Sequence, residues 1–486
     1  MFNLLGSKVF RFLSLVVVAL IIGSCAVNPV TGKKEVMFMS EEQEIALGKQ
    51  SDPQIVAMYG LYQDNQLQKF INEKGQEMAS VSHRPNLNYE FKILDSPVVN
   101  AFALPGGYVY FTRGILAHFN NEAEFAGVLG HEIGHVTARH SAKQQTKATI
   151  AQILFIGGLV VSPAFRNFAN EAQQGMQLLF LKYSRDNESQ SDELGVQYST
   201  KIGYDAHQMA DFFNTLNQMR VGTEAESLPT FLSTHPDPYD RYKKVSQLAD
   251  KAQAKANPAD FKVNRNSYLK MIDGIIYGDD PKQGYVENNM FYHPEMRFQF
   301  PIPSGWQTMN TPSQVQMAPS DGTAMMLLTL TQANTLQAAA DSTLQKYGLT
   351  QVERKTLTLN GMQVLAMVSD QANQQTGQTI RILTYFISYR DLIFTFHGLA
   401  EKANFDGQVS NFNQTMRNFK VLTDQSKINK KPDRISVRTA NKSSTLQSLL
   451  VAAKIPEDQF HEHAIINGME LDSQVSAGDL YKVIVK

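Results

Sequence analysis

The sequence predicts a multidomain α+β protein, in which a mostly helical region with a small β-sheet precedes an α+β domain and a small C-terminal module. The chain has 486 residues, more than one hydrophobic core usually supports. Helical spacing of apolar residues prevails up to about residue 255, and strand-like alternation prevails between residues 290 and 424. The composition, 43% hydrophobic and 19% charged, is that of a globular protein. A net charge of -1 does not favour a nucleic-acid partner.

Residues 1–24 have the pattern of an export signal. Lys8 and Arg11 give a positive start, and the apolar run 12–22 is shorter than the roughly 20 residues that cross a bilayer. Cys25 follows this run and is the only cysteine, so it cannot form an internal disulfide. Its position resembles a bacterial lipobox, which implies that Cys25 becomes the acylated first residue of a lipoprotein. A free thiol, a dimer link, or an ordinary signal peptide or anchor with an incidental cysteine are the alternatives.

The residue after Cys25 is alanine and not aspartate. In Gram-negative lipoproteins this implies the outer membrane, so we expect an exported protein that its N-terminal lipid holds on the periplasmic face of that membrane. Residues 25–40 include the polar stretch NPVTGKK with Pro and Gly, and are predicted to be a tether.

Residues 41–255 are predicted to form one domain of helices around a few strands. Ser40 and Gln43 stand three residues apart, as in a capping box, at the start of its first helix. Asn121 and Glu124 repeat this spacing before a helix that we expect to run to about His140. The other helices expected here cover residues 66–81, 142–161, 171–183, 187–201, 207–219 and 239–255, and the extended segments cover residues 89–94, 98–104 and 108–111. The apolar run within 142–161 either dips into a membrane or packs in the core, and its length of about twelve residues favours the core.

The pattern changes after residue 256. Residues 256–289 contain Pro258 and Pro281 in polar surroundings and are predicted to be a linker. Residues 290–424 are predicted to be an α+β accessory domain with a hairpin turn at Asn360-Gly361. Its strands are expected at residues 297–301, 325–331, 363–369, 381–388 and 392–397, and its helices at residues 336–347 and 405–419. After a basic linker at 427–432, the last segment shows strand, helix, helix and strand signals, and neither C-terminal part shows a catalytic pattern.

The chemistry of the sequence is concentrated in His131-Glu132-Ile133-Gly134-His135. Residues four apart share one face of a helix, so both imidazoles can reach one ion, as in H-E-x-x-H metal sites. Zinc binds neutral imidazole nitrogens and accepts an open fourth position for water, whose pKa it lowers to roughly 7. Glu132 lies beside the pair and is suited to take a proton from that water. A chance match on a surface helix is the alternative, but this helix is apolar and well capped.

Two histidines leave such a site one ligand short, and Glu188 is the best candidate for the third. Glu188 and Asp192 are four residues apart in a segment with a helical pattern, so they share a face. One carboxylate can bind the metal, and the other can accept a hydrogen bond from the outer nitrogen of a ligand histidine. His140 is a nearby rival, but it points away from His135 on a straight helix. Without the upstream motif, the two carboxylates would be expected on a solvated helix face.

Five segments, taken in order, resemble a known family. They are NPVTGK (28–33), NAFALPGGYVYFTRGIL (100–116), HEIGH (131–135), YSRDNESQSDELG (183–195) and STHPDPYDR (233–241). Over residues 28 to 255 the chain resembles the HtpX/CAAX-prenyl-protease-like gluzincin zinc metallopeptidases, and most of all their bacterial lipoprotein branch related to BepA. Several motifs in the right order are more specific than a lone H-E-x-x-H.

The resemblance implies a mostly helical zincin catalytic domain with one Zn²⁺ per chain. His131, His135 and Glu188 would hold the metal, and Glu132 would act as general base and acid. Asp192 matches the aspartate that supports a ligand histidine in this family. Ser191 stands where the family usually has alanine, a small change that leaves the metal assignment intact.

His235 and Arg241 match the His-Pro and Arg positions of the family's last motif. His235 could stabilise the oxyanion of the tetrahedral intermediate, or it could bind the metal in a resting form. The plain alternative is a turn histidine before Pro236. Arg241 either orients this segment or pairs with a carboxylate on its own helix.

The extended segment Asn100, Ala101, Phe102 and Ala103 is expected to bind the substrate backbone by strand addition, unless it is an ordinary core strand. Strand addition reads the backbone more than the side chains, so substrate selection would be loose. This suits an enzyme that acts on unfolded or misassembled exported proteins.

The two C-terminal parts carry weaker resemblances. Residues 290–424 resemble the PsbP/Mog1-like α+β fold. Residues 433–486 resemble a LysM module, with Ile465-Ile466-Asn467-Gly468 before a final strand. LysM modules bind glycans, so peptidoglycan is a candidate partner, and a protein-binding or packing module is the alternative.

The sequence therefore predicts a membrane-tethered zinc metalloendopeptidase of the cell envelope. The first alternative is a chaperone-like envelope assembly lipoprotein in which proteolysis is latent. The second is a glycan-tethered structural lipoprotein, which only the C-terminal module favours.

Overall fold

The computed structural model describes residues 25–144, 183–221, 231, 235, 238–372 and 378–486. The expected signal peptide, the apolar run at 150–161 and most of the helix expected at 171–183 lie outside these residues. Within the described ranges, no helix combines the length and the apolar character needed to cross a membrane.

The first described residues, in the segment expected to be a tether, form a small hairpin. Strands β1 (Cys25–Val27) and β2 (Lys34–Val36) pair antiparallel. Asn28 is fully buried, and its side-chain oxygen accepts a hydrogen bond from the Val30 amide at 2.8 Å. The side chain of Asn28 therefore closes the turn at the NPVTGK segment, as Asn does in many turns.

The N-terminal domain consists of helices packed on a three-stranded sheet with the order β3-β5-β4. Its helices are α2 (Glu41–Tyr59), α3 (Asn65–Ser80), α4 (Arg113–His118), α5 (Glu122–Thr137), α8 (Arg185–Lys201), α9 (His207–Val221) and α11 (Pro238–Gln253), and its strands are β3 (Glu90–Leu94), β4 (Ala101–Leu104) and β5 (Tyr108–Thr112). Strand β3 runs parallel to β5, whereas β4 runs antiparallel to it and forms an edge of this sheet. The capping box of Ser40 and Gln43 is present at the start of α2, as predicted.

Helix α5 is the centre of this domain, and every residue of it from Ala123 to Thr137 is buried. It packs so closely on α8 that a Cβ atom at Gly130 would lie 3.0 Å from the Cα of Gly195. Side chains that flank this crossing on the two helices are thereby brought together. The helix ends at Thr137 and not near His140 as expected, because Arg139 adopts a left-handed conformation with φ of 56° and turns the chain back.

Residues 256–289 hold more structure than a linker would. They form the 3₁₀ turns Pro258–Asp260 and Pro281–Gln283, helix α12 (Arg265–Met271) and strands β6 (Ile276–Tyr277) and β7 (Tyr285–Glu287). Tyr268 and Leu269 of α12 are fully buried in the same core as Phe125 of α5. The part of this stretch around α12 is thus packed on the N-terminal domain, whereas β7 pairs with the strand β8 (Met290–His293) of the next domain.

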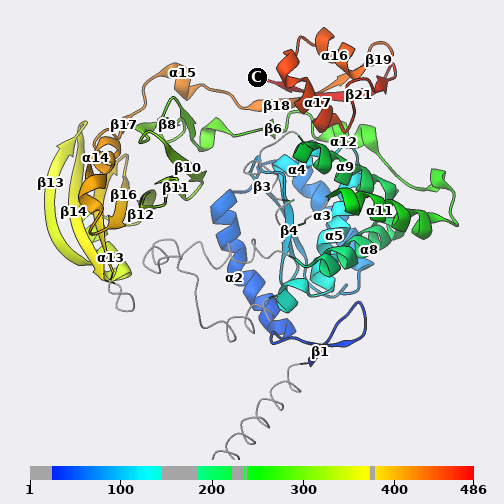
Figure 1. The fold of residues 1–486 in the computed structure, drawn as a ribbon, viewed down its shortest axis with the longest axis horizontal. Coiled ribbons are helices and arrows are strands. Elements are labelled where there is room, and N and C mark those ends of the chain that lie inside the picture. The colour runs from blue at the N-terminus through cyan, green and yellow to red at the C-terminus, as the bar shows by residue number, and fades with distance from the viewer. Residues whose placement is uncertain (1–24, 145–182, 222–230, 232–234, 236–237, 373–377) are drawn as a thin grey trace, which may run out of the picture.

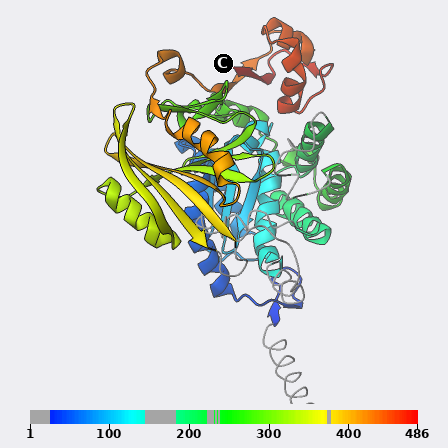
Figure 2. The ribbon, with the colours of Figure 1, turned by 60° about the vertical axis from the view of Figure 1, so that its left-hand side comes forward.

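The sheet domain, residues 290–424, is built on a seven-stranded antiparallel sheet with the order β10-β11-β12-β16-β15-β14-β13. Its strands are β8 (Met290–His293), β9 (Phe298–Pro301), β10 (Trp306–Thr311), β11 (Gln314–Pro319), β12 (Ala324–Thr331), β13 (Thr350–Leu359), β14 (Met362–Ala372), β15 (Thr379–Tyr389), β16 (Leu392–Glu401) and β17 (Lys420–Val421). Helices α13 (Leu336–Tyr347) and α14 (Phe405–Met416) lie on opposite sides of the sheet (Figure 2). Asn360 and Gly361 both have positive φ and connect β13 to β14, which confirms the predicted hairpin turn.

The C-terminal module, residues 433–486, contains the predicted strand, helix, helix and strand. They are β18 (Asp433–Thr439), α16 (Leu446–Ala452), α17 (Phe460–Asn467) and β21 (Leu480–Val485), with the short strands β19 (Ser444–Thr445) and β20 (Gln474–Val475), and a short helix α15 (Gln425–Ile428) precedes them. Strand β18 pairs with β21 on one side and with β6 on the other. Ile435, Ile466 and Leu480 join the core of the N-terminal domain. Figure 1 shows the module beside α9 and α12, away from the seven-stranded sheet.

Candidate metal centre

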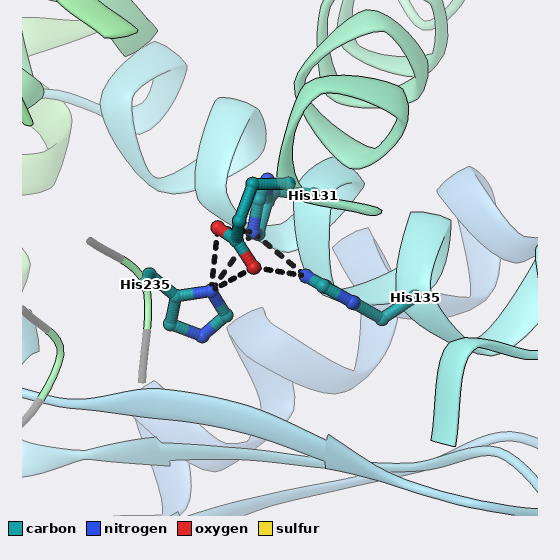
Figure 3. A group of neighbouring side chains, drawn as sticks. His131, His135 and His235 are labelled. Carbon is teal, nitrogen blue, oxygen red and sulfur yellow. Dashed lines mark hydrogen bonds and ion pairs between the residues drawn. The ribbon is translucent and has the colours of Figure 1, made fainter. Parts of the chain in front are cut away.

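Four side chains from three elements meet at one point in the N-terminal domain. His131 and His135 extend from α5, Glu188 extends from α8, and His235 lies three residues before α11. One ligand atom of each residue lies within 4.8 Å of the others, and all four side chains are buried. Figure 3 shows the three histidines directed toward a common point.

The distances within this cluster are short and nearly uniform. The two Nε2 atoms of His131 and His135 are 3.0 Å apart. The Nδ1 atom of His235 lies 3.3 Å from Nε2 of His131 and 2.9 Å from Oε2 of Glu188. The carboxylate of Glu188 lies 3.6 Å from the Nε2 atom of His131 and 3.5 Å from that of His135.

These distances fit a tetrahedral metal site. Donors placed about 2.1 Å from a zinc ion at the corners of a tetrahedron are roughly 3.4 Å apart. Three imidazole nitrogens and one carboxylate oxygen are also the donors that zinc favours. The four side chains therefore fit the zinc ion that the sequence implies.

The electrostatics of His135 and Glu188 match this donor set. Burial, together with the neighbouring His131, lowers the pKa of His135, which favours the neutral imidazole that binds metals. Burial raises the pKa of the Glu188 carboxyl, but His235 and Arg241 outweigh it and hold that pKa below its ordinary value. Burial lowers the pKa of His235, and the facing Glu188 outweighs it and raises the pKa.

Glu132 lies next to the cluster with one oxygen free. Its Oε1 atom is buried, has no hydrogen-bond partner among the described residues, and lies 3.8 Å from Nε2 of His235. Burial raises the pKa of the Glu132 carboxyl, while His235 and His131 oppose this shift. A buried carboxylate with a raised pKa and an open oxygen is suited to accept a proton.

Asp192 and Arg241 contact members of the cluster through hydrogen bonds and ion pairs. Asp192 Oδ1 lies 3.0 Å from Nδ1 of His131, the nitrogen on the far side of the ring from the cluster. Arg241 donates to Asp192 through Nη2 at 2.6 Å and through Nε at 3.0 Å, and its Nη1 lies 3.3 Å from Glu188. The guanidinium of Arg241 also lies 4.0 Å from the centre of the Phe213 ring. The alternative in which Arg241 pairs with a carboxylate on its own helix is wrong, because the carboxylates it contacts, Asp192 and Glu188, lie on α8.

The expected substrate strand lies at the edge of the small sheet. Ala101, Phe102 and Ala103 are in β4, and Asn100 precedes it with its backbone hydrogen-bonded to Thr112. The Phe231 amide donates to the carbonyl of Val99 at 3.2 Å. The segment that carries His235 is thus tied to the residue just before this edge.

Two contacts of the site were not foreseen from the sequence. His140 was expected to point away from His135, but their Nδ1 atoms are 3.0 Å apart, because the chain reverses at Arg139. Nε2 of His140 also lies 3.0 Å from Oε1 of Gln190. Tyr183 stacks on the ring of His135 with centroids 4.0 Å apart. The left-handed turn had no sequence signal, since it lies at an arginine, but Tyr183 begins one of the resembling motifs.

Fold and site together define a metallopeptidase-type domain. Residues 65–249 match the family model described as peptidase family M48. The matched residues include all four members of the cluster.

Three curated relatives are similar over this region. The mitochondrial metalloendopeptidase OMA1 of Arabidopsis thaliana is 32% identical over 186 residues, which are 38% of this chain and 36% of that protein. The beta-barrel assembly-enhancing protease of Yersinia pestis is 29% identical over 257 residues, 50% of each chain. Its counterpart in Escherichia coli K12 is 29% identical over 232 residues, 45% of each chain. The similarity thus spans half or less of the length of these relatives.

Among solved structures, cyanobacterial PsbP from Synechocystis has a TM-score of 0.23 and 12% identity, and covers 27% of this chain and 91% of its own. The Saccharomyces cerevisiae Ran-binding protein Mog1p has a TM-score of 0.23 and 14% identity, and covers 29% of this chain and 99% of its own.

Proposed function

We propose that this protein is a zinc-dependent metalloendopeptidase of the cell envelope. The observation that carries the proposal is the convergence of His131, His135 and Glu188 on one point, with the free oxygen of Glu132 beside it. The match to peptidase family M48 over the same residues supports it. The relatives named metalloendopeptidase and beta-barrel assembly-enhancing protease support it further.

The chemistry divides among a few side chains. Zinc held by His131, His135 and Glu188 would polarise the scissile carbonyl and lower the pKa of a water molecule. Glu132 takes a proton from the attacking water at its free oxygen and later passes it to the leaving amine. Asp192 keeps the proton of His131 on Nδ1 and so directs Nε2 toward the metal. Arg241 holds Asp192 and Glu188 in place.

His235 acts as a fourth donor in the closed arrangement seen here. Its Nδ1 lies 3.3 Å from Nε2 of His131 and 2.9 Å from Oε2 of Glu188, distances similar to those among the other three donors. A catalytic zinc site needs one position for water, and four protein donors leave none. We therefore propose that His235 closes the resting site and moves away before substrate is cut. Once displaced, its ring is near enough to stabilise the oxyanion, which was the other expectation.

Substrates bind along β4. Asn100, Ala101, Phe102 and Ala103 offer an edge of backbone next to the segment that carries His235. A peptide added there forms mainly backbone hydrogen bonds, so an extended, unfolded chain is the preferred substrate. We propose unfolded or misassembled exported proteins, a choice that the names of the bacterial relatives support.

The proposed location in the cell is inferred from the N-terminal sequence. We propose that residues 1–24 are a lipoprotein signal peptide, that the lipid on Cys25 anchors the protein on the periplasmic face of the outer membrane, and that the chain belongs to the lipoprotein branch related to BepA. The C-terminal module remains a candidate LysM-like peptidoglycan binder, and the sheet domain a PsbP/Mog1-like accessory domain.

Casein cleavage by residues 26–486 tests the central claim. Wild type and Glu132→Gln are compared, and the zinc content of the same samples is measured. The proposal expects about one zinc in both proteins and cleavage only by wild type. Two proteins without zinc would contradict it, and equal cleavage by both would remove Glu132 from its role.

The chaperone-like alternative has one observation in its favour, the closure of the site by His235. A protein that binds substrates and seldom cuts them would keep this closure. His235→Ala separates the two functions. Faster cleavage by this variant identifies a latent peptidase, whereas zinc-loaded His235→Ala that binds unfolded protein and leaves it intact favours the chaperone.

A further inference from the structure

The turn between α4 and α5 depends on residues far away in the sequence. The Leu116 carbonyl accepts a hydrogen bond from the hydroxyl of Tyr268 at 2.7 Å. The carbonyls of Ala117 and Phe119 both accept from Nζ of Lys482, each at 3.0 Å. The C-terminal module thus supplies the donor for two carbonyls that the end of α4 leaves without helical partners.

The position of Lys482 is fixed by its burial and by hydrogen bonds of its backbone to Asn467. It lies on β21 and is fully buried. Its backbone amide donates to Oδ1 of Asn467 at 2.7 Å, and Nδ2 of Asn467 donates back to its carbonyl at 2.9 Å. Burial lowers the pKa of the Lys482 ammonium, and the nearby Glu124 carboxylate opposes this shift. A fully buried lysine is costly to fold, so its contacts must offset that cost.

Glu124 connects this contact to the helix of the metal centre. It is the third residue of α5, and its Oε2 accepts from the Asn120 amide at 2.8 Å. Arg265 donates to the Asn120 carbonyl at 3.3 Å and to the Leu480 carbonyl of the C-terminal module at 3.3 Å. The entry into α5 is therefore fastened to the module by Lys482 and Arg265.

A displacement of the first residues of α5 would move the whole helix. His131 follows Glu124 by seven residues, about 10 Å along the same helix axis. At Gly130 the helix already touches Gly195 of α8, so it cannot shift without changing its distance from Glu188. Metal ligands on α5 and α8 are thus sensitive to how the turn is held.

We propose that Lys482 is a positioning residue for the metal centre, through which the C-terminal module holds His131 and His135 in register with Glu188. The catalytic part of this proposal rests on the proposed peptidase function, but the effect on metal binding does not. Loss of the Nζ donor would leave the two carbonyls unpaired and let the entry of α5 move.

The test uses residues 26–486 with Lys482→Met and a matched control, Lys442→Met, which removes an exposed lysine from the same module. Zinc affinity is measured by competition with a chelator, and kcat and KM are measured on casein per zinc-loaded site well below the melting temperature. We expect Lys482→Met to bind zinc about tenfold or more weakly and to lose about tenfold or more in kcat, with KM unchanged. Lys442→Met should match wild type.

A purely structural role of Lys482 would give another result. The melting temperature would fall, while zinc affinity and kcat per loaded site would stay within about twofold of wild type, and this outcome overturns the proposal. If Lys482→Met does not fold, Lys482→Gln, which keeps one donor, is measured in the same way and judged by the same criteria. If wild type and His235→Ala both bind zinc but cut nothing, the proposed function fails, and the zinc competition alone still decides the role of Lys482.

Discussion

The N-terminal domain and the sheet domain bury very different side chains. Around α5, buried ionisable groups are numerous, and they include Glu44, Arg84, Arg113, Glu124, Glu132, Arg139, Glu188, Asp192 and Arg241 as well as the histidines. Among the described residues 290–424, no Asp, Glu, Lys or Arg is buried, and the buried polar residues are Thr343, Ser369, Gln371, Thr384, Thr395, His397 and Thr415. Buried charged side chains destabilise a fold unless they are paired. A domain that keeps many of them is therefore expected to use them in its function. The comparison indicates that the candidate reactive side chains lie in the N-terminal domain. The interior of the sheet domain is explained by packing.

Removal of a proposed metal ligand should have the largest effect of the substitutions considered. This effect should be confined to the N-terminal domain. Glu188→Ala is expected to weaken zinc affinity by at least about a thousandfold, near 4 kcal/mol, since each of a few ligands carries a large part of the binding free energy. Chelator competition measures it. Ser369→Ala, which changes a buried polar residue of the sheet domain, is the control and should leave zinc affinity unchanged.

Loss of an aromatic side chain should be the largest effect in the sheet domain. Phe412 on α14 is fully buried against Trp306 and Phe405. Phe412→Ala is expected to lower the free energy of unfolding of this domain by about 3 kcal/mol, because it leaves a cavity. Urea denaturation followed by the fluorescence of Trp306, the only tryptophan, measures it. A loss of zinc affinity in this variant would break the separation between the two domains.

His397, a buried histidine of the sheet domain, predicts a pH dependence. Burial lowers its pKa to about 4, so it is neutral in the folded protein while an unfolded histidine titrates near 6.5. The unfolded state then binds more protons, so stability is lost as pH falls from about 6.5 to about 4, by roughly 2–3 kcal/mol at most. Urea denaturation at several pH values should show a flatter profile for His397→Asn than for wild type. Parallel profiles would contradict this account.

Helix caps offer the smallest and most closely matched comparison. Asn121 caps α5 through the Glu124 amide at 2.8 Å, and Thr335 caps α13 through the Ala338 amide at 3.1 Å. Replacement of either by Ala should cost about 1 kcal/mol of stability. Only Asn121→Ala is expected to weaken zinc binding as well, because α5 carries proposed metal ligands and α13 carries none. Equal zinc affinity in both variants would show that the start of α5 has no influence on the site.

Local features of this protein were predictable from the sequence. The caps at Ser40 and Asn121, the turn at Asn360-Gly361 and the shared face of His131 and His135 depend on residues within one or two turns of each other. Such features follow from backbone geometry and short side-chain contacts, which are the same in any fold. Glu188 was predicted by a resemblance over several motifs, and its distance to His131 needed the packing of α5 on α8.

Tertiary structure alone decided the rest. The left-handed turn at Arg139 that brings His140 to His135, the contact of His235 with His131, and the insertion of Lys482 under α4 all join residues through contacts that no spacing pattern records. The first follows from one left-handed residue, and the other two join residues more than 100 positions apart in the chain. Their geometry depends on how the whole core packs, including α12 and β21. The sequence by itself determined the donor types of the candidate metal centre, and the fold determined that His235 lies among them and that the C-terminal module contacts the turn before α5.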